Sequence, residues 1–162
     1  MVSLTELKGV DMKRDQIIKL PEECKTVFIC LGWEHDKEFD VDASVVGLNG
    51  EKEEECKVFY TSTTAKGLKH MGDDREGSET KLGDREMIKV NFQKLSKEVV
   101  ELYVTLHIFS EKFTFKNVKD AYVRVCVAEG ENKEAKPGIE IAKYPIDIIC
   151  KSQALIFARL VK

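Results

Sequence analysis

The chain has 162 residues, of which 43% are hydrophobic and 34% are charged, and it carries a net charge of −3 with a pI of about 5.7. This balance excludes an intrinsically disordered chain and gives no support to nucleic-acid binding, because domains that bind nucleic acids are normally basic. No stretch approaches the ~20 apolar residues of a transmembrane segment, and the N-terminus has no apolar run typical of a signal peptide, so we expect neither feature.

The cysteines are odd in number and scattered. None of them forms a C-x-x-C pair: they are Cys24, Cys30, Cys56, Cys126 and Cys150. This pattern is more typical of reduced thiols in the cytoplasm than of a disulfide framework. We therefore expect a cytoplasmic protein in which several cysteines are small buried hydrophobic residues.

Alternation of apolar and polar residues with a period of two is the dominant pattern along the chain and predicts strands. It appears first in Val27–Leu31 and Phe39–Val46, and again in Val100–Ile108 and Ala121–Val127. The last expected strand, Ala154–Val161, is more continuously apolar, as in a strand that is covered on both faces.

Turn signals separate these strands. Asn49-Gly50 predicts a hairpin with a type I′ turn, in which both central residues have positive φ; it joins Phe39–Leu48 to a second strand ending near Val58-Phe59-Tyr60. Thr61–Asp84 is irregular and acidic, and loops of this length are usually functional or disordered. Phe92–Glu98 is expected to make one helical turn.

The sequence as a whole predicts an all-β fold. A longer hairpin loop over Glu129–Gly138 completes a series of short strands with regular turns, which favours a two-sheet antiparallel β-sandwich. We expect one domain over residues 1–162, with a long acidic loop and at most short helical turns.

Two acidic segments are the candidate functional site. In Phe39–Ser44, Asp40, Asp42 and Ser44 share one strand face while the alternate residues pack inward, and the two carboxylates are about 6.6–6.8 Å apart along the strand. The second segment runs from Gly72 to Glu86. Its acids are Asp73, Asp74, Glu76, Glu79, Asp84 and Glu86, and its cations are Arg75, Lys81 and Arg85.

Calcium is the ion that this composition favours, because it binds six to eight oxygens from carboxylates, backbone carbonyls and water. A loop rich in Gly and acids supplies both kinds of protein oxygen, and folded beside Asp40 and Asp42 it would form a cage at one end of the sandwich. The alternative is that the acids are simply solvated. An EF-hand is excluded, because Val45 occupies the loop position that requires Gly.

Other polar residues give weaker signals. We expect His35 and His70 in surface loops and His107 on an outward strand face, without metal-ligand spacing. Trp33 is expected to anchor the core or a loop. An enzyme using Asp40 and Asp42 as an acid–base pair would need a substrate pocket and a raised pKa on one carboxylate, neither of which the sequence indicates.

Several segments together point to a known family. In order along nearly the whole chain they are Leu31-Gly32-Trp33, Phe39-Asp40-Val41-Asp42-Ala43-Ser44, Val58-Phe59-Tyr60, His70-Met71-Gly72-Asp73-Asp74, Glu86–Val90, Phe115–Arg124 and Ala154–Leu160. The chain thereby resembles the tellurium-resistance TerD family. This resemblance implies a β-sandwich that binds calcium through clustered acids, belongs to stress responses linked to tellurite and other insults, and has no established enzymatic activity.

The resemblance also implies which residues bind the metal. Asp40 and Asp42 match the D-x-D pair of the family, Asp73 matches a G-D-N motif, and Asp74 stands where the family prefers Asn. The acidic run that follows is weakened, because Lys81 and Arg85 intrude and either cation could partly replace the ion. The predicted metal ligands are Asp40, Asp42, Asp73, Asp74, Glu79, Asp84 and Glu86.

We therefore expect a non-enzymatic, calcium-binding stress-response protein whose partners are calcium ions and a further protein or a second copy, but not nucleic acid. Two alternatives remain open. One is a metal-free protein-interaction sandwich that has lost part of the calcium site. The other is a cyclic-nucleotide-binding relative, because some members of the family are described as cyclic-AMP-binding.

Overall fold

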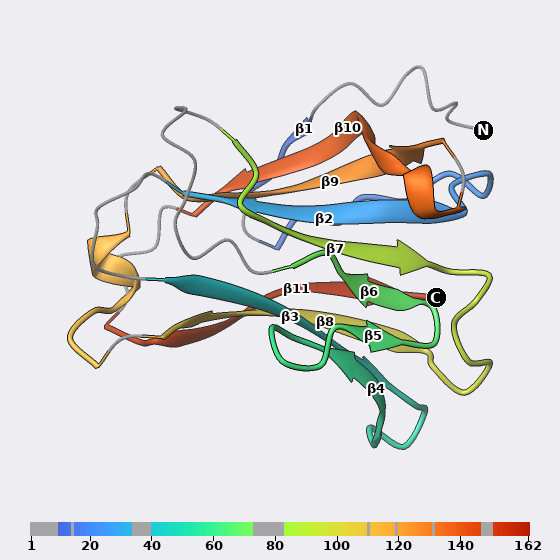
Figure 1. Ribbon diagram of the computed structural model, residues 1–162, viewed down its shortest axis with the longest axis horizontal. Helices are drawn as coiled ribbons and strands as arrows, with labels where there is room; N and C mark the ends of the chain where they lie inside the picture. The colour runs from blue at the N-terminus through green and yellow to red at the C-terminus, as the bar shows by residue number, and fades with distance from the viewer. Residues whose placement is uncertain are drawn as a thin grey trace.

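The computed structural model describes residues 10–13, 15–33, 40–72, 83–109, 111–118, 120–130, 132–146 and 151–162. Two sheets face each other (Figure 1), so the expected all-β sandwich is confirmed. The seven-stranded sheet has the order β1-β10-β9-β2-β7-β6-β5, and the four-stranded sheet has the order β11-β8-β3-β4. All strand pairs are antiparallel except the short pair of β1 with β10.

The strands of the seven-stranded sheet are β1 (Val10–Asp11), β2 (Thr26–Gly32), β5 (Thr64–Ala65), β6 (Leu68–His70), β7 (Glu86–Asn91), β9 (Tyr122–Glu129) and β10 (Lys136–Pro145). Those of the four-stranded sheet are β3 (Val41–Leu48), β4 (Glu54–Val58), β8 (Glu101–Ile108) and β11 (Ala154–Val161). The 3₁₀ turns η1 (Phe115–Asn117) and η2 (Asn132–Glu134) complete the description. In this described part of the chain, no helix has the length and apolar character needed to cross a membrane.

The core lies between the two sheets. On β3 the inward residues are Val41, Ala43 and Val45, as the alternation predicts, and each is at most 3% exposed. They pack with inward residues of β8 and β7, such as Leu106 and Ile88. Full burial of an aliphatic side chain of this size contributes about 1.5–3 kcal/mol, so the inward row of each strand fixes which face it turns to the core.

A second, smaller cluster covers the opposite face of the seven-stranded sheet. It consists of Phe28, Cys30, Cys126 and Ala135, and every member is at most 8% exposed. Because this cluster lies over β2, the strand is buried on both faces. The alternation in Val27–Leu31 predicts the strand correctly, but it does not predict that a second cluster buries the other face.

The β3–β4 hairpin exists as predicted, but its turn is not type I′. Positive φ occurs at Lys52 (67°), and neither Asn49 nor Gly50 has it. The reason is the Asn49 side chain, whose Oδ1 accepts hydrogen bonds from the backbone N–H groups of Glu51 and Glu53, both at 2.9 Å. This local pairing stabilises a wider turn, closed by hydrogen bonds of Lys52 N to Asn49 O and of Asn49 N to Glu53 O.

The first part of the stretch predicted to be irregular, Thr61–Asp84, contains the short strands β5 and β6. They pair with each other, and β6 continues the sheet beside β7. Gly67 makes the turn between them with a φ of 80°, and a Cβ at this position would lie 2.6 Å from the backbone nitrogen of Leu95. Leu95 N in turn bonds to Asn91 O, which closes the single helical turn expected in Phe92–Glu98.

Strand β11 is an edge strand, and the expectation that it is covered on both faces is wrong. It pairs only with β8 in the four-stranded sheet, and Ile156 is 72% exposed while Val161 is 64% exposed. Leu155 and Phe157 supply the face that packs on the core. The continuous apolar run therefore indicated the strand but not its position at the sheet edge.

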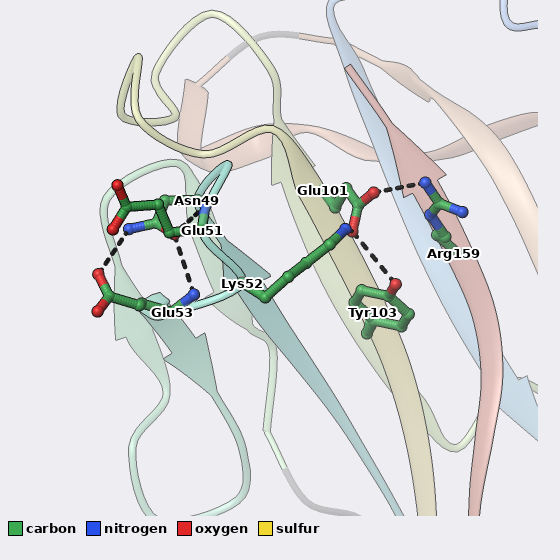
Figure 2. A network of polar contacts seen from close by, with 7 residues as sticks. All are labelled: Asn49, Glu51, Lys52, Glu53, Glu101, Tyr103 and Arg159. Carbon is green, nitrogen blue, oxygen red and sulfur yellow. Dashed lines mark hydrogen bonds and ion pairs between the residues drawn. The ribbon is translucent and has the colours of Figure 1, made fainter.

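A polar network at one end of the four-stranded sheet joins the hairpin turn to β8 and β11 (Figure 2). Glu101 is buried and accepts hydrogen bonds from Lys52 Nζ at 2.5 Å, from Tyr103 Oη at 3.2 Å and from Arg159. The hydrogen bond from Lys52, followed by those from Arg159 and Tyr103, lowers the pKa of the Glu101 carboxyl against the opposing effect of burial. The carboxylate has donors on both oxygens, so this network is structural.

Candidate functional site

The predicted acidic residues that the structure describes lie at one end of the sandwich, which we call the acidic end. It comprises Asp40, Asp42, His70, Asp84 and Glu86, at the start of β3 and β7 and at the end of β6. The predicted ligands Asp73, Asp74 and Glu79 lie outside the described residues, as does Lys81.

Asp42 projects from β3 on the side opposite to the core, as predicted from the alternation. It is opposite His107 of β8 and only 8% exposed. Asp40 directly precedes β3, and its backbone oxygen accepts a hydrogen bond from Phe109 N at 3.0 Å. Both aspartates take part in interactions within the protein.

Glu86 is almost completely buried, at 1% exposed, and it connects the two sheets. Its side chain lies on the inward face of β7, as does that of Ile88, whereas Met87 lies on the outer face. Its Oε2 accepts a hydrogen bond from the backbone N–H of Ala43 on β3. This N–H is available because β4 pairs with β3 only from Val45 onwards.

His70 is the second buried polar residue here, and the prediction of a surface loop is wrong. It ends β6 and is 2% exposed. Its Nδ1 accepts a hydrogen bond from Gly72 N–H at 3.2 Å, which assigns the proton of the neutral ring to Nε2. Nε2 lies 3.8 Å from Glu86 Oε2, too far for a hydrogen bond.

Two buried atoms at this point have no hydrogen-bond partner in the described residues: His70 Nε2 and Glu86 Oε1. Such orphaned atoms are uncommon, because most buried polar groups in native proteins are paired with protein or water. A buried carboxylate oxygen without a donor suits a cation, which supplies the missing electrostatic partner. The burial and the unpartnered oxygen of the Glu86 carboxylate therefore fit a metal ligand.

Asp84 lies on the other face of the seven-stranded sheet and is already engaged. Arg124 donates from Nε to Oδ1 at 2.8 Å and from Nη2 to Oδ2 at 2.5 Å, and Tyr122 Oη donates to Oδ1 at 3.0 Å. The hydrogen bonds with Asp84 raise the pKa of the Arg124 guanidinium, while burial and then Asp84 raise that of the Tyr122 hydroxyl. Asp84 and Glu86 are thus separated by the sheet.

Arg85 contacts Trp33 through both its side-chain charge and a hydrogen bond. Its guanidinium lies 5.1 Å from the centre of the Trp33 ring, and its Nε donates to Trp33 O at 2.9 Å. Trp33 is 7% exposed and belongs to the core, so the expectation that it anchors the core is confirmed. Arg85 fastens β7 to the end of β2.

The described residues do not by themselves form a complete metal site. Within them, no three His, Cys, Asp or Glu side chains come together in a group that could hold a metal ion. Tyr122 and Arg124 were not singled out by sequence reasoning, since they lie 38 and 40 positions from their partner Asp84 and no local pattern marks either pair. Glu86 was predicted, and the structure adds its burial and its unpartnered oxygen.

Comparisons with known proteins agree with this fold. A family model described as TerD domain matches residues 9–162. A crystal structure of SAV2460, a protein of unknown function, superposes with a TM-score of 0.66 at 15% sequence identity, covering 87% of this chain and 82% of that one. A homologue of the telluride resistance protein TerD from Streptomyces coelicolor superposes with a TM-score of 0.65 at 14% identity, covering 85% and 81%.

Proposed function

Because the chain belongs to the TerD domain family, we propose that it is a cytoplasmic, non-enzymatic stress-response domain of the tellurium-resistance type that binds calcium at its acidic end. Membership of the family supports the tellurium-resistance assignment. The free thiols of Cys24, Cys30, Cys56 and Cys126 support a reducing compartment.

One observation carries the calcium proposal: Glu86 Oε1 is buried and has no hydrogen-bond partner among the described residues. The desolvation of such an oxygen costs about 1–3 kcal/mol or more when the group is charged. A cation at Oε1 offsets that cost while Oε2 keeps its hydrogen bond with Ala43 N, which holds the carboxylate in one orientation. Calcium suits the position because it binds oxygen ligands in flexible geometry.

The proposed ligands among the described residues are Asp40, which precedes β3, Asp42 on β3 and Glu86 on β7, and these three do not form a complete site by themselves. The predicted ligands Asp73, Asp74 and Glu79 belong to the segment outside the described residues. Asp84 could join them only by giving up its ion pair with Arg124. Bound calcium would neutralise the mutual repulsion of the clustered carboxylates.

Isothermal titration with calcium after treatment with a chelator tests the proposal, using the parent, Glu86→Gln and Glu101→Gln. The Glu86 variant keeps the volume and the acceptor for Ala43 N but loses the charge. Glu101 is also a buried acid, on the other sheet, and its oxygens already have donors. We expect the parent and Glu101→Gln to bind calcium and Glu86→Gln to lose most of the affinity. A parent that releases no heat with calcium, or a Glu86 variant that binds like the parent, overturns the calcium site.

An exposed group of aromatic rings beside the acidic end favours a second function, protein interaction. Phe109 is 63% exposed and makes edge contacts with the rings of Tyr60 and His107. Exposed aromatic side chains are enriched at protein interfaces. Sedimentation velocity of the parent and of Phe109→Ser tests for self-association. A parent that binds no calcium, yet associates in a way that Phe109→Ser abolishes, would favour the metal-free interaction domain.

A further inference from the structure

Among the described residues, Cys30, Cys126 and Met87 place their sulfur atoms on the outer face of the seven-stranded sheet, and the calcium proposal uses none of them. Cys30 on β2 and Cys126 on β9 are both 0% exposed, and Met87 on β7 packs against the cluster that contains them. The three side chains come from adjacent strands, because the sheet order runs β9-β2-β7. The sulfurs therefore gather across three strands on one face.

Strand register brings these side chains together. Cys30 is directly opposite Met87, and directly opposite residues of an antiparallel pair have Cβ atoms about 4.5–5.5 Å apart. Cys126 is opposite Phe28, two residues from Cys30, so the two cysteines are diagonal neighbours. Met87 faces this side, whereas the adjacent Glu86 faces the core, so the sulfur group and the proposed calcium ligand lie on opposite faces of the sheet.

The two thiols interact directly. A hydrogen bond between them raises the pKa of the Cys30 thiol, with burial adding to the effect, and the same hydrogen bond lowers the pKa of Cys126. The charge of Asp84 raises the pKa of each thiol, whereas the Arg124 guanidinium, opposite Cys30 on β9, lowers it. The Cys30 and Cys126 side chains are therefore neighbours within one buried cluster.

We propose that Cys30, Cys126 and Met87 form a binding site for a soft monovalent cation, with Cu(I) as the representative ion. Thiolate and thioether ligands select Cu(I), and a hard ion such as calcium prefers the oxygens of the acidic end. The cation takes the place of the proton between the two thiols, and both thiol protons pass to solvent. Two thiolates and one monovalent cation leave one negative charge, beside the ion pair of Arg124 with Asp84.

Other cysteines of the chain provide the matched controls. Cys24 is buried in the main core, and Cys56 is half-buried and packs against that core. Neither belongs to the cluster of Cys30 and Cys126. A cysteine that acts only as a small hydrophobic residue should not affect metal affinity, which separates the proposed site from general thiol binding.

The test is a competition for Cu(I) between the protein and excess bicinchoninate, under anaerobic conditions with ascorbate to keep thiols and copper reduced. We expect the parent to retain one Cu(I) per chain. Loss of a supporting outer contact typically weakens a metal site 10–100-fold, so loss of a ligand in Cys30→Ser or Cys126→Ser should weaken binding by about 100-fold or more. Met87→Leu should cost about tenfold, as expected for a weaker thioether ligand. Cys24→Ser and Cys56→Ser should bind like the parent.

A parent that takes no Cu(I) from the chelator overturns the proposal, and so does an equal loss in Cys56→Ser. If a cysteine variant fails to fold, X-ray absorption at the copper edge of the loaded parent decides alone. Two or three sulfur neighbours support the site, whereas nitrogen or oxygen ligation contradicts it.

Discussion

Glu86 on β7 and Ala43 on β3 are joined by a hydrogen bond from the backbone N–H of Ala43 to the Glu86 carboxylate at 2.5 Å. The contact links the seven-stranded sheet to the four-stranded sheet at the acidic end, where β3 lacks β4 as a neighbour. It satisfies a backbone donor at the open part of a strand and orients a buried carboxylate with one oxygen left over. The same side chain therefore has a structural role and a proposed metal-binding role.

We predict that calcium raises the melting temperature of the parent and that magnesium does so much less. A ligand at about 100 times its Kd adds about 2.7 kcal/mol to the free energy of unfolding, which corresponds to roughly 5–10 °C for a domain of this size. Magnesium requires tight octahedral geometry and gives up its waters reluctantly. Identical melting curves in millimolar calcium and in chelator would contradict the prediction.

The stability contributed by Glu101 should depend on pH in the acidic range. Its hydrogen bonds with Lys52, Arg159 and Tyr103 lower the folded-state pKa below the ordinary value of 4.5. A lowered pKa gives a contribution that is present above the unfolded-state pKa and is lost as the pH falls through the folded-state pKa. The parent should therefore exceed Glu101→Gln in stability at pH 7, and the difference should shrink below about pH 4.5. Urea unfolding of both proteins across this range measures it, and a difference independent of pH would show that the charge does not matter.

Gly67 should not tolerate a side chain. Alanine there would be held at a φ of 80°, and its Cβ would lie 2.6 Å from Leu95 N. Backbone strain of this kind costs on the order of 1–3 kcal/mol before any clash is counted. Gly50→Ala is the control, because the space around Gly50 is open within 4 Å, and we expect a change within about 0.5 kcal/mol. Thermal unfolding of the two variants would refute the argument if they were equally stable.

These cases show what the sequence predicts well. Period-two alternation indicated β3, β8 and β9, because an inward row of aliphatic residues such as Val41, Ala43 and Val45 is required wherever a sheet faces a core. The alternation does not show whether other residues bury the outer face of a strand. It therefore missed the second cluster over β2. The continuous apolar run of Ala154–Val161 predicted a cover on both faces that β11, an edge strand, does not have.

Short strands and pairs of residues far apart in the chain could not be predicted from the sequence, for a different reason. Strands β5 and β6, of two and three residues, are too short to show a period, so His70 was assigned to a loop. At the acidic end, Glu86 was found because it continues an acidic run. Arg124, which pairs with Asp84 across 40 positions, gave no local signal.

Arg85→Ala should destabilise the protein and alter the fluorescence of Trp33, the single tryptophan. The guanidinium over the ring and the hydrogen bond to Trp33 O together contribute about 0.5–2 kcal/mol. Lys143→Ala removes a similar cation, which lies 4.4 Å from the centre of the Tyr122 ring, and should leave Trp33 emission unchanged. An emission spectrum of Arg85→Ala that matches the parent would mean that the Trp33 contact does not persist in solution.

The last prediction separates two predicted ligands, Asp84 and Asp42. Asp84 has both carboxylate oxygens bound by Arg124, so Asp84→Asn should reduce stability by roughly 1–3 kcal/mol. Calcium affinity should stay within about twofold, equivalent to ~0.4 kcal/mol. Asp42→Asn should instead lose most of the calcium affinity.

A third variant, Arg124→Gln, gives the opposite test. If calcium binds Asp84, the ion must displace Arg124, and removing the guanidinium should tighten calcium binding. If Asp84 only holds Arg124 on the outer face of the sheet, the same change should leave the affinity unaltered. Tighter binding in Arg124→Gln, together with loss of binding in Asp84→Asn, would return Asp84 to the ligand set and would mean that calcium binding rearranges the ion pair with Arg124.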